Sequence, residues 1–138
     1  MIIFLDTNIV LDILLKRQPY FDTSLEAVDK ALDEKADMAV SANCITDIFY
    51  IAKRQGLNAA DIKENLEDFL SFVEIVSVNK GDILRALKTE CNDLEDELQA
   101  QCALKIKADY IITRDTEFCG YSIRVASPKE FIEYMNEI

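Results

Sequence analysis

Short apolar runs alternate with segments of helical periodicity along the whole chain. The apolar runs occupy residues 2–5, 38–40, 74–78 and 110–113, with a weaker one at 122–125. Runs without polar alternation are typical of strands buried on both faces of a parallel sheet. The segments between them favour helices that cross over to the next strand. We therefore predict an α/β fold, a single three-layer domain over residues 1–138, with a mostly parallel sheet of four to five strands flanked by helices.

Turn and capping residues place the expected helices. Gly56 is a candidate left-handed stop, and residues 127–130 (Ser-Pro-Lys-Glu) combine an N-cap, a proline at the first helical position and a capping-box glutamate. We expect helices from residue 7 to before residue 19, over 22–35, 44–56, 58–72, 82–88 and 93–107, and after 127.

Composition favours one buried core in a soluble, cytoplasmic protein. Half of the 138 residues are apolar, and only three are Gly and two Pro. No apolar stretch reaches the roughly 18–20 residues of a membrane span, and the N-terminus lacks a signal-peptide pattern, so no membrane association is expected. The four cysteines show no C-x-x-C spacing, and we expect reduced thiols.

The chain contains no histidine, which excludes Ser-His-Asp and Cys-His mechanisms and zinc sites of the Cys/His kind. Any acid-base chemistry must therefore use carboxylates. The formal net charge of −11 disfavours broad electrostatic attraction to nucleic acid and suits a basic protein partner. Cations bound by converging carboxylates would change the sign of the charge locally.

Acidic residues stand where strands are expected to end. Asp6 follows the first run, Asp115 follows the run at 110–113, and Asp93 and Asp96 open the helix between them. Asp47 lies one turn into the helix after the second strand. Because ligands bind outside the carboxyl ends of parallel strands, these side chains can share one crevice. We interpret them as a carboxylate cage for Mg²⁺ or Mn²⁺.

Each aspartate also has a structural interpretation. Asp6 can cap the helix that follows it, and Asp93 and Asp96 can favour the helix dipole of a first turn. Asp115 can start a turn through its side chain. The joint topology favours the metal site over these separate explanations.

The same residues resemble the motifs of the PIN-domain nuclease family, which includes VapC-like toxin ribonucleases. Residues 4–12 (FLDTNIVLD) resemble the family's first motif, and residues 93–99 (DLEDELQ) resemble a D-x-x-D-x-x-Q stretch. Residues 108–118 resemble the closing T-R-D-x-x-F motif. The ordered set spans nearly the whole chain.

The resemblance implies an Mg²⁺- or Mn²⁺-dependent endoribonuclease. Asp6, Asp96 and Asp115 would be the metal ligands, with Asp93 beside them as a ligand or an orienting residue. Asp47 departs from the family, which usually has Glu at this point, so its shorter side chain is expected to act through a water. The products would carry a 5′-phosphate and a 3′-hydroxyl.

Polar residues near the cage have candidate supporting roles. Thr7, Asn8 and Asn43 are candidates to brace the aspartates or to contact a phosphate, although each Asn can also cap its own helix. Basic side chains at the same end of the sheet are candidate contacts to the RNA backbone: Lys16, Arg17, Lys53, Arg54 and Arg114. Solvated helix ends are the alternative for the first four.

Competing functions differ in the residues they require. A haloacid-dehalogenase-type phosphatase needs a second Asp at position 8, where this chain has Asn, and a receiver domain needs an Asp after the third strand. The serious alternative is a catalytically weak PIN-like module that binds RNA or protein. The resemblance further implies the toxin of a toxin-antitoxin pair, with single-stranded or structured RNA as substrate, a small basic antitoxin as partner and a homodimer, for which residues 59–72 are a candidate interface.

Overall fold

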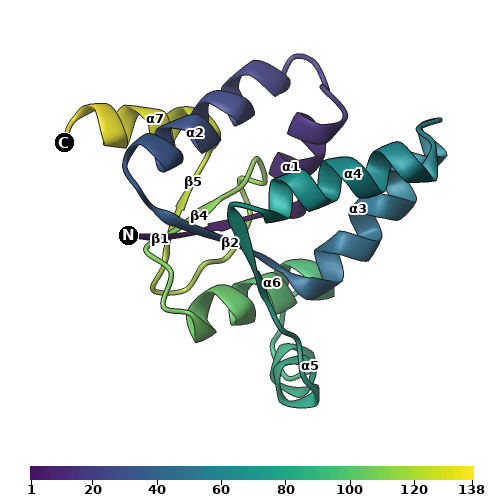
Figure 1. Cartoon of the computed structure of the whole chain (residues 1–138). Helices are drawn as coiled ribbons and strands as arrows, with labels where there is room; N and C mark the ends of the chain where they lie inside the picture. The colour runs from purple at the N-terminus through teal and green to yellow at the C-terminus, as the bar shows by residue number, and fades with distance from the viewer.

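Five parallel strands form the central sheet of the computed structural model, which describes residues 1–138 (Figure 1). The strand order is β3-β2-β1-β4-β5, and every neighbouring pair is parallel. The strands are β1 (Ile2–Leu5), β2 (Asp37–Ser41), β3 (Val73–Val76), β4 (Tyr110–Ile112) and β5 (Arg124–Ala126). The predicted α/β fold with a parallel sheet is therefore confirmed.

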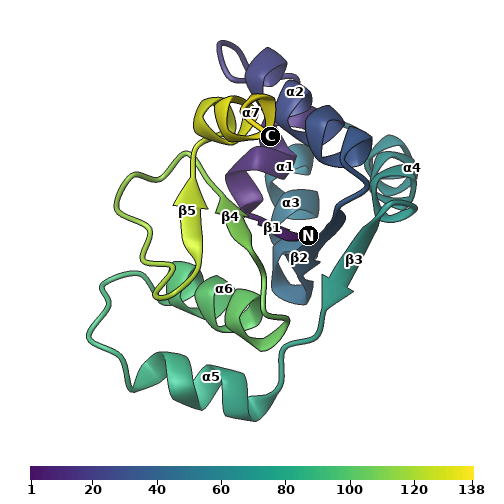
Figure 2. The ribbon, with the colours of Figure 1, turned by 90° about the vertical axis from the view of Figure 1, so that its left-hand side faces the viewer.

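Seven helices cover the two faces of this sheet. They are α1 (Thr7–Leu14), α2 (Phe21–Asp33), α3 (Ala42–Arg54), α4 (Ala59–Leu70), α5 (Lys80–Leu87), α6 (Leu94–Lys105) and α7 (Pro128–Asn136). Figure 2 shows α6 below the sheet with α5 outside it, while α1, α2 and α7 lie above. Buried side chains of α3 and α4 belong to the same core cluster as those of α1, α2 and α7. The α3–α4 hairpin projects on the side where β1 and β2 end (Figure 1).

The alternation of side chains along β1 separates two cores. Ile3 and Leu5 belong to the larger cluster, under the helices of the upper face, whereas Phe4 belongs to a smaller cluster with Ala100 and Cys102 of α6. All three β1 side chains are almost completely buried. The strand therefore lacks the alternation of apolar and polar residues found where one face of a sheet is exposed to solvent, as its sequence predicted.

Two strand boundaries differ from the sequence expectation for the same reason. The strand expected at 74–78 is Val73–Val76, because its partner β2 ends at Ser41, which is paired with Val76. The strand expected at 122–125 is Arg124–Ala126, because β4 begins at Tyr110, the partner of Arg124. Strand limits are set by the neighbouring strand, which a local sequence pattern does not contain.

Helix α5 is attached to α6 through the buried carboxylate of Asp82. It accepts hydrogen bonds from Lys105 Nζ at 2.7 Å and from Arg85, and it closes a capping box with Asn79. The hydrogen bond from Lys105 and the capping bond at Asn79 hold the pKa of Asp82 below its ordinary value. This helix therefore begins at Lys80, ahead of the expected residue 82.

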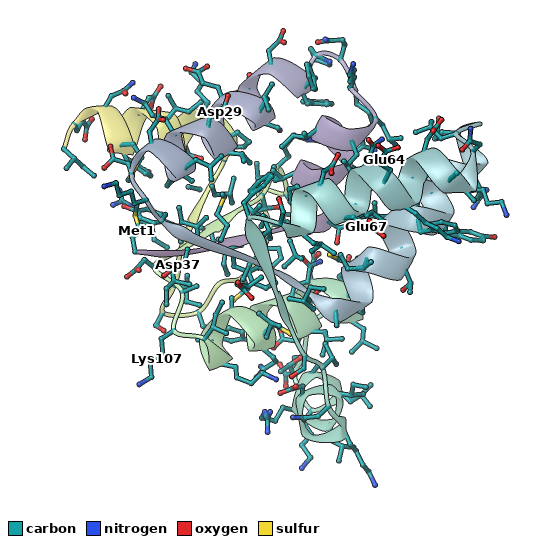
Figure 3. All side chains as sticks on the ribbon, in the orientation of Figure 1. Met1, Asp29, Asp37, Glu64, Glu67 and Lys107 are labelled. Carbon is teal, nitrogen blue, oxygen red and sulfur yellow. The ribbon has the colours of Figure 1, made fainter.

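Many acidic side chains are spread over the outer surface. Asp29 of α2 and Glu64 and Glu67 of α4 point outward from their helices (Figure 3). All three are exposed. None of the helices combines the length and the apolar character that crossing a bilayer requires. These exposed acidic residues of α2 and α4 are thus a different set from the acidic residues at the strand ends.

Candidate functional site

Asp6 connects the ends of the two central strands. It follows β1, and its backbone N–H donates to the carbonyl of Ile112 at the end of β4 (3.0 Å). Its carboxylate Oδ2 accepts hydrogen bonds from Thr113 Oγ1 at 2.6 Å and from Asn8 Nδ2 at 3.1 Å. Although Asp6 stands at the N-cap position of α1, its side chain makes no capping bond. The carboxylate is therefore directed toward the strand ends, and the capping explanation does not apply to it.

Burial makes ionisation of Asp6 unfavourable. Its side chain is almost fully covered, and desolvation raises its carboxyl pKa above the ordinary value. The hydrogen bond from Thr113 opposes this rise, and the charge of Asp115 adds to it. A buried carboxylate with a second carboxylate nearby is favourable when a cation compensates both charges.

Asp96 and Asp115 both line a neighbouring cleft of about 350 Å³. Asp115 is held by its own turn, because its backbone N–H donates to Thr113 Oγ1 (3.0 Å) and its Oδ1 accepts from the N–H of Glu117 (2.9 Å). Desolvation, the adjacent carboxyl group of Asp115 and the charge of Asp6 raise the pKa of Asp96 to about 8. The raised pKa of Asp96 shows that its ionisation is unfavourable beside these carboxylates when no cation is bound.

Asp93 lines the same cleft and also caps α6. Its Oδ1 accepts from the backbone N–H of Asp96 at 3.0 Å, which leaves Oδ2 free, and its side chain is exposed. Asp93 therefore acts as the N-cap of α6, and this hydrogen bond holds it beside Asp96.

Glu95 is a site residue that the sequence reasoning missed. Its Oε1 accepts from Thr7 Oγ1 at 3.4 Å, and burial together with the charges of Asp47 and Asp6 raises its pKa. Asp47 therefore lies close enough to Glu95 for its charge to act on that carboxyl group. The spacing from Asp93 and Asp96 gave no reason to select Glu95, because acidic first turns are common; only the folded contact with Thr7 identifies it.

Asn8 and Asn43 occupy different environments. Asn8 braces the carboxylate of Asp6 through Nδ2, and its Oδ1 accepts from the backbone N–H of Arg114 at 3.4 Å. Asn43 lies in the first turn of α3, and its buried Oδ1 has no hydrogen-bond partner. Asn8 thus fixes the turns after β1 and β4 relative to each other.

Two of the expected RNA contacts, Arg17 and Arg114, are paired with a buried carboxylate. Arg114 and Arg17 both bind the carboxylate of Asp12, which is completely buried, and Arg114 stacks on the ring of Tyr20 with 3.7 Å to its centroid. Part of the hydrogen-bonding capacity of both guanidinium groups is therefore used by Asp12. The prediction placed both arginines at the strand ends without their acidic partner, which lies on the inner side of α1.

The other three basic residues remain free of acidic partners. Lys16, Lys53 and Arg54 are exposed, and none forms an ion pair. Arg54 lies over the ring of the exposed Tyr50, 5.6 Å from its centroid. Lys53 and Arg54 end α3 at the tip of the projecting hairpin.

The donor set has the chemistry of a site for a hard divalent cation. The carboxylates supply oxygen ligands, the kind that Mg²⁺ and Mn²⁺ prefer. No three Cys, Asp or Glu side chains already converge closely enough to enclose an ion. Gln99, however, is buried beside Asp6 with both polar atoms of its amide unpartnered, as expected for a side chain that meets a water or ion. The residues present therefore fit a hydrated cation, which keeps several of its waters as ligands.

Residues 2–117 match the family model described as "PIN domain". The chain belongs to the PIN-domain family. This PIN domain is 28% identical to "Ribonuclease VapC1" of Aquifex aeolicus (strain VF5), over 99% of this chain and 96% of the relative. The sequence-based resemblance is thereby confirmed.

Solved structures show the same fold at low identity. The Mycobacterium tuberculosis "VapC20 (Rv2549c), Sarcin-Ricin loop cleaving toxin" gives a TM-score of 0.67 at 13% identity, covering 84% of this chain and 92% of that one. The "Toxin-antitoxin complex from Klebsiella pneumoniae" gives 0.65 at 19% identity, covering 91% and 96%. Both likenesses extend over most of the PIN domain.

Proposed function

We propose that this PIN domain is a metal-dependent endoribonuclease, with Mg²⁺ or Mn²⁺ as its cofactor and residues 1–138 as a single PIN-like domain. The observation that carries the proposal is the arrangement of three aspartates. Asp6, Asp96 and Asp115 come from the end of β1, the start of α6 and the turn after β4. Asp6 and Asp115 nevertheless both raise the pKa of Asp96, and the charge of Asp115 also raises that of Asp6. The relative from Aquifex aeolicus, which carries the name ribonuclease, supports the choice of RNA.

The three aspartates are the residues that would hold the metal, with Asp93 and Glu95 beside them. When bound, the metal lowers the pKa of a water for attack on phosphorus and offsets charge on the leaving oxygen. Thr113 and Asn8 hold the Asp6 carboxylate in one orientation through its Oδ2. Asp47 contributes through its charge and a bridging water. Hydrolysis that breaks the bond between phosphorus and the 3′ oxygen leaves a 5′-phosphate and a 3′-hydroxyl.

RNA binding is assigned first to the basic residues without acidic partners, with Arg17 and Arg114 as further candidates that are already paired with Asp12. Lys53 and Arg54 at the tip of the α3–α4 hairpin, and Lys16 after α1, are exposed. The α3–α4 hairpin that carries Lys53 and Arg54 projects on the side of the molecule where β1 and β2 end (Figure 1). Single-stranded or structured RNA would reach the cleft along this side, with its backbone held by these cations.

We further propose that the protein is the toxin of a toxin-antitoxin pair. The Klebsiella pneumoniae structure, which is a toxin-antitoxin complex, supports this role. The net charge of −11 and the acidic cleft suit a small basic antitoxin. The protein would form a homodimer and act in the cytoplasm.

The experiment is cleavage of a panel of single-stranded and structured RNAs in Mg²⁺, Mn²⁺ and EDTA. The proposal expects metal-dependent cutting by the wild-type protein with 5′-phosphate products. Asp96→Asn and Asp115→Asn should lose the activity, while Asp29→Asn on the outer face of α2 should retain it. Equal cutting by all variants would indicate a contaminant. No cutting of any RNA, despite metal binding, would favour the catalytically weak binding module, for which the short side chain of Asp47 is the supporting feature.

A further inference from the structure

Three side chains in this protein carry buried polar atoms without any hydrogen-bond partner: Ser41, Asn43 and Gln99. Such groups destabilise the folded state, and native proteins keep few of them. Ser41 ends β2, Asn43 lies in the next turn, and Gln99 lies one helical turn after Asp96 on α6. All three therefore lie around the carboxylates at the strand ends.

Gln99 is the most complete case. Its side chain is 1% exposed, and neither Nε2 nor Oε1 has a partner. Gln99 lies close enough to Asp6 to lower the pKa of its carboxyl group. The distance and angle between the two side chains nevertheless fall outside those of a hydrogen bond. An apolar residue of this size would fill the same volume without an unpaired amide. Core packing therefore does not explain a glutamine here.

The free atoms of Asp6 and Gln99 match each other. Both side-chain hydrogen bonds to Asp6 end on Oδ2, from Thr113 and from Asn8, so Oδ1 has no side-chain donor. The Gln99 amide can supply one hydrogen bond through Nε2, and its Oε1 can accept one from a water. A hydrated cation would bring that water into a crevice that the carboxylates make strongly negative.

We propose that Gln99 is a positioning residue of the metal site, whose amide orients the Asp6 carboxylate and holds a water of a hydrated divalent cation. The inference rests on the proposed metal-dependent function. Gln99 does not touch the RNA and acts through Asp6. Its unpaired amide costs stability in the protein without metal and is satisfied when the cation binds.

The test replaces Gln99 by methionine, which has a similar shape and no amide. For Gln99→Met we expect an unfolding temperature in EDTA equal to or above that of the wild type. We also expect a loss of Mn²⁺ affinity of about 10-fold to 100-fold, the usual effect of removing a group that orients a metal ligand. The readouts are thermal unfolding in EDTA and calorimetric titration with Mn²⁺. Gln99→Leu repeats the test with a different side-chain shape.

Gln101→Met is the matched control on the same helix. Gln101 Nε2 donates to Glu97 Oε1 at 3.0 Å, so this variant loses an existing hydrogen bond and should not gain stability. Its Mn²⁺ affinity should equal that of the wild type. If both Gln99 variants unfold at lower temperature and bind Mn²⁺ as the wild type does, Gln99 is a structural residue and the inference is wrong.

Two results separate this inference from the proposed function. A wild type that binds Mn²⁺ but cleaves no RNA contradicts the nuclease assignment, while the Gln99 variants still decide the positioning role through affinity. A wild type that cleaves RNA while Gln99→Met leaves Mn²⁺ affinity unchanged overturns the positioning role alone. A wild type that does not bind Mn²⁺ overturns both.

Discussion

Arg114 donates two hydrogen bonds to Asp12, from Nε to Oδ2 at 2.7 Å and from Nη2 to Oδ1 at 3.0 Å. Asp12 is completely buried and also accepts from Arg17 and from Ser24 Oγ. Since Arg114 directly precedes Asp115, this ion pair fixes the turn after β4 onto α1. The fold thus uses two cations to compensate one buried carboxylate just behind the candidate metal site.

Asp12→Ala should lower the free energy of unfolding by about 2–3 kcal/mol. Removing one partner of a buried ion pair costs roughly 3–5 kcal/mol, and the partial exposure of both guanidinium groups reduces this value. Urea unfolding measures the change. Asp29→Ala on the neighbouring helix, whose side chain is exposed, should change stability by less than about 0.5 kcal/mol. Equal stability of the two variants would contradict the role of Asp12.

Stability without metal should fall as the pH rises. The folded-state pKa values of Asp6, Glu95 and Asp96 are raised, that of Asp96 to about 8, so the folded protein binds more protons than the unfolded chain above about pH 4. Their stabilising contribution is present at low pH and is lost up to about pH 8. We expect the unfolding temperature in EDTA to fall by roughly 3–8 °C between pH 5 and pH 8.

Two comparisons check this origin of the pH dependence. Asp96→Asn should make the unfolding temperature depend less on pH, because asparagine does not ionise. Saturating Mn²⁺ should likewise reduce the pH dependence of the wild type. Asp82 and Glu130, whose pKa values are lowered, affect stability only at lower pH. An unfolding temperature that is constant or rises over pH 5–8 in EDTA would contradict the coupling among the acidic residues.

Mn²⁺ should raise the unfolding temperature of the wild type at pH 7.5. A ligand that binds only the folded state adds about 2.7 kcal/mol at 100 times its Kd, which is several degrees for a chain of this size. Asp115→Asn should abolish the shift because one ligand and one charge are lost. Glu64→Gln, on the exposed face of α4, should retain it. A shift of equal size in both variants would place the bound ion elsewhere.

Neutralising Lys53 and Arg54 should weaken RNA cleavage mainly through KM. Replacing both by Gln removes two phosphate contacts, so the dependence of binding on salt concentration should become less steep by up to about two units. Lys107→Gln is the control, because Lys107 precedes β4 on the side of the molecule where the strands begin, the side of Met1 and Asp37 (Figure 3). Equal KM values in the double variant and the control would exclude the hairpin from RNA binding.

Part of this structure could be predicted from the sequence because the determining signals are local. The uninterrupted apolar runs predicted a parallel sheet, and the sheet then placed Asp6 and Asp115 at neighbouring strand ends. The ion pair of Arg114 with Asp12 joins residues 102 positions apart, and no local pattern records it. Glu95 and Gln99 were missed because acidic first turns and helical glutamines are common, and only the three-dimensional contacts distinguish them.

The most direct test of the account measures RNA cleavage as a function of Mn²⁺ concentration for the wild type and for Asp6→Asn. We expect the wild-type rate to follow the same saturation curve as Mn²⁺ binding measured by calorimetry, with 5′-phosphate ends on the products. Asp6→Asn, folded as judged by circular dichroism, should show neither the binding nor the cleavage. Wild-type cleavage that is independent of Mn²⁺ and Mg²⁺, or that persists at the same rate in Asp6→Asn, would contradict the metal-dependent nuclease site.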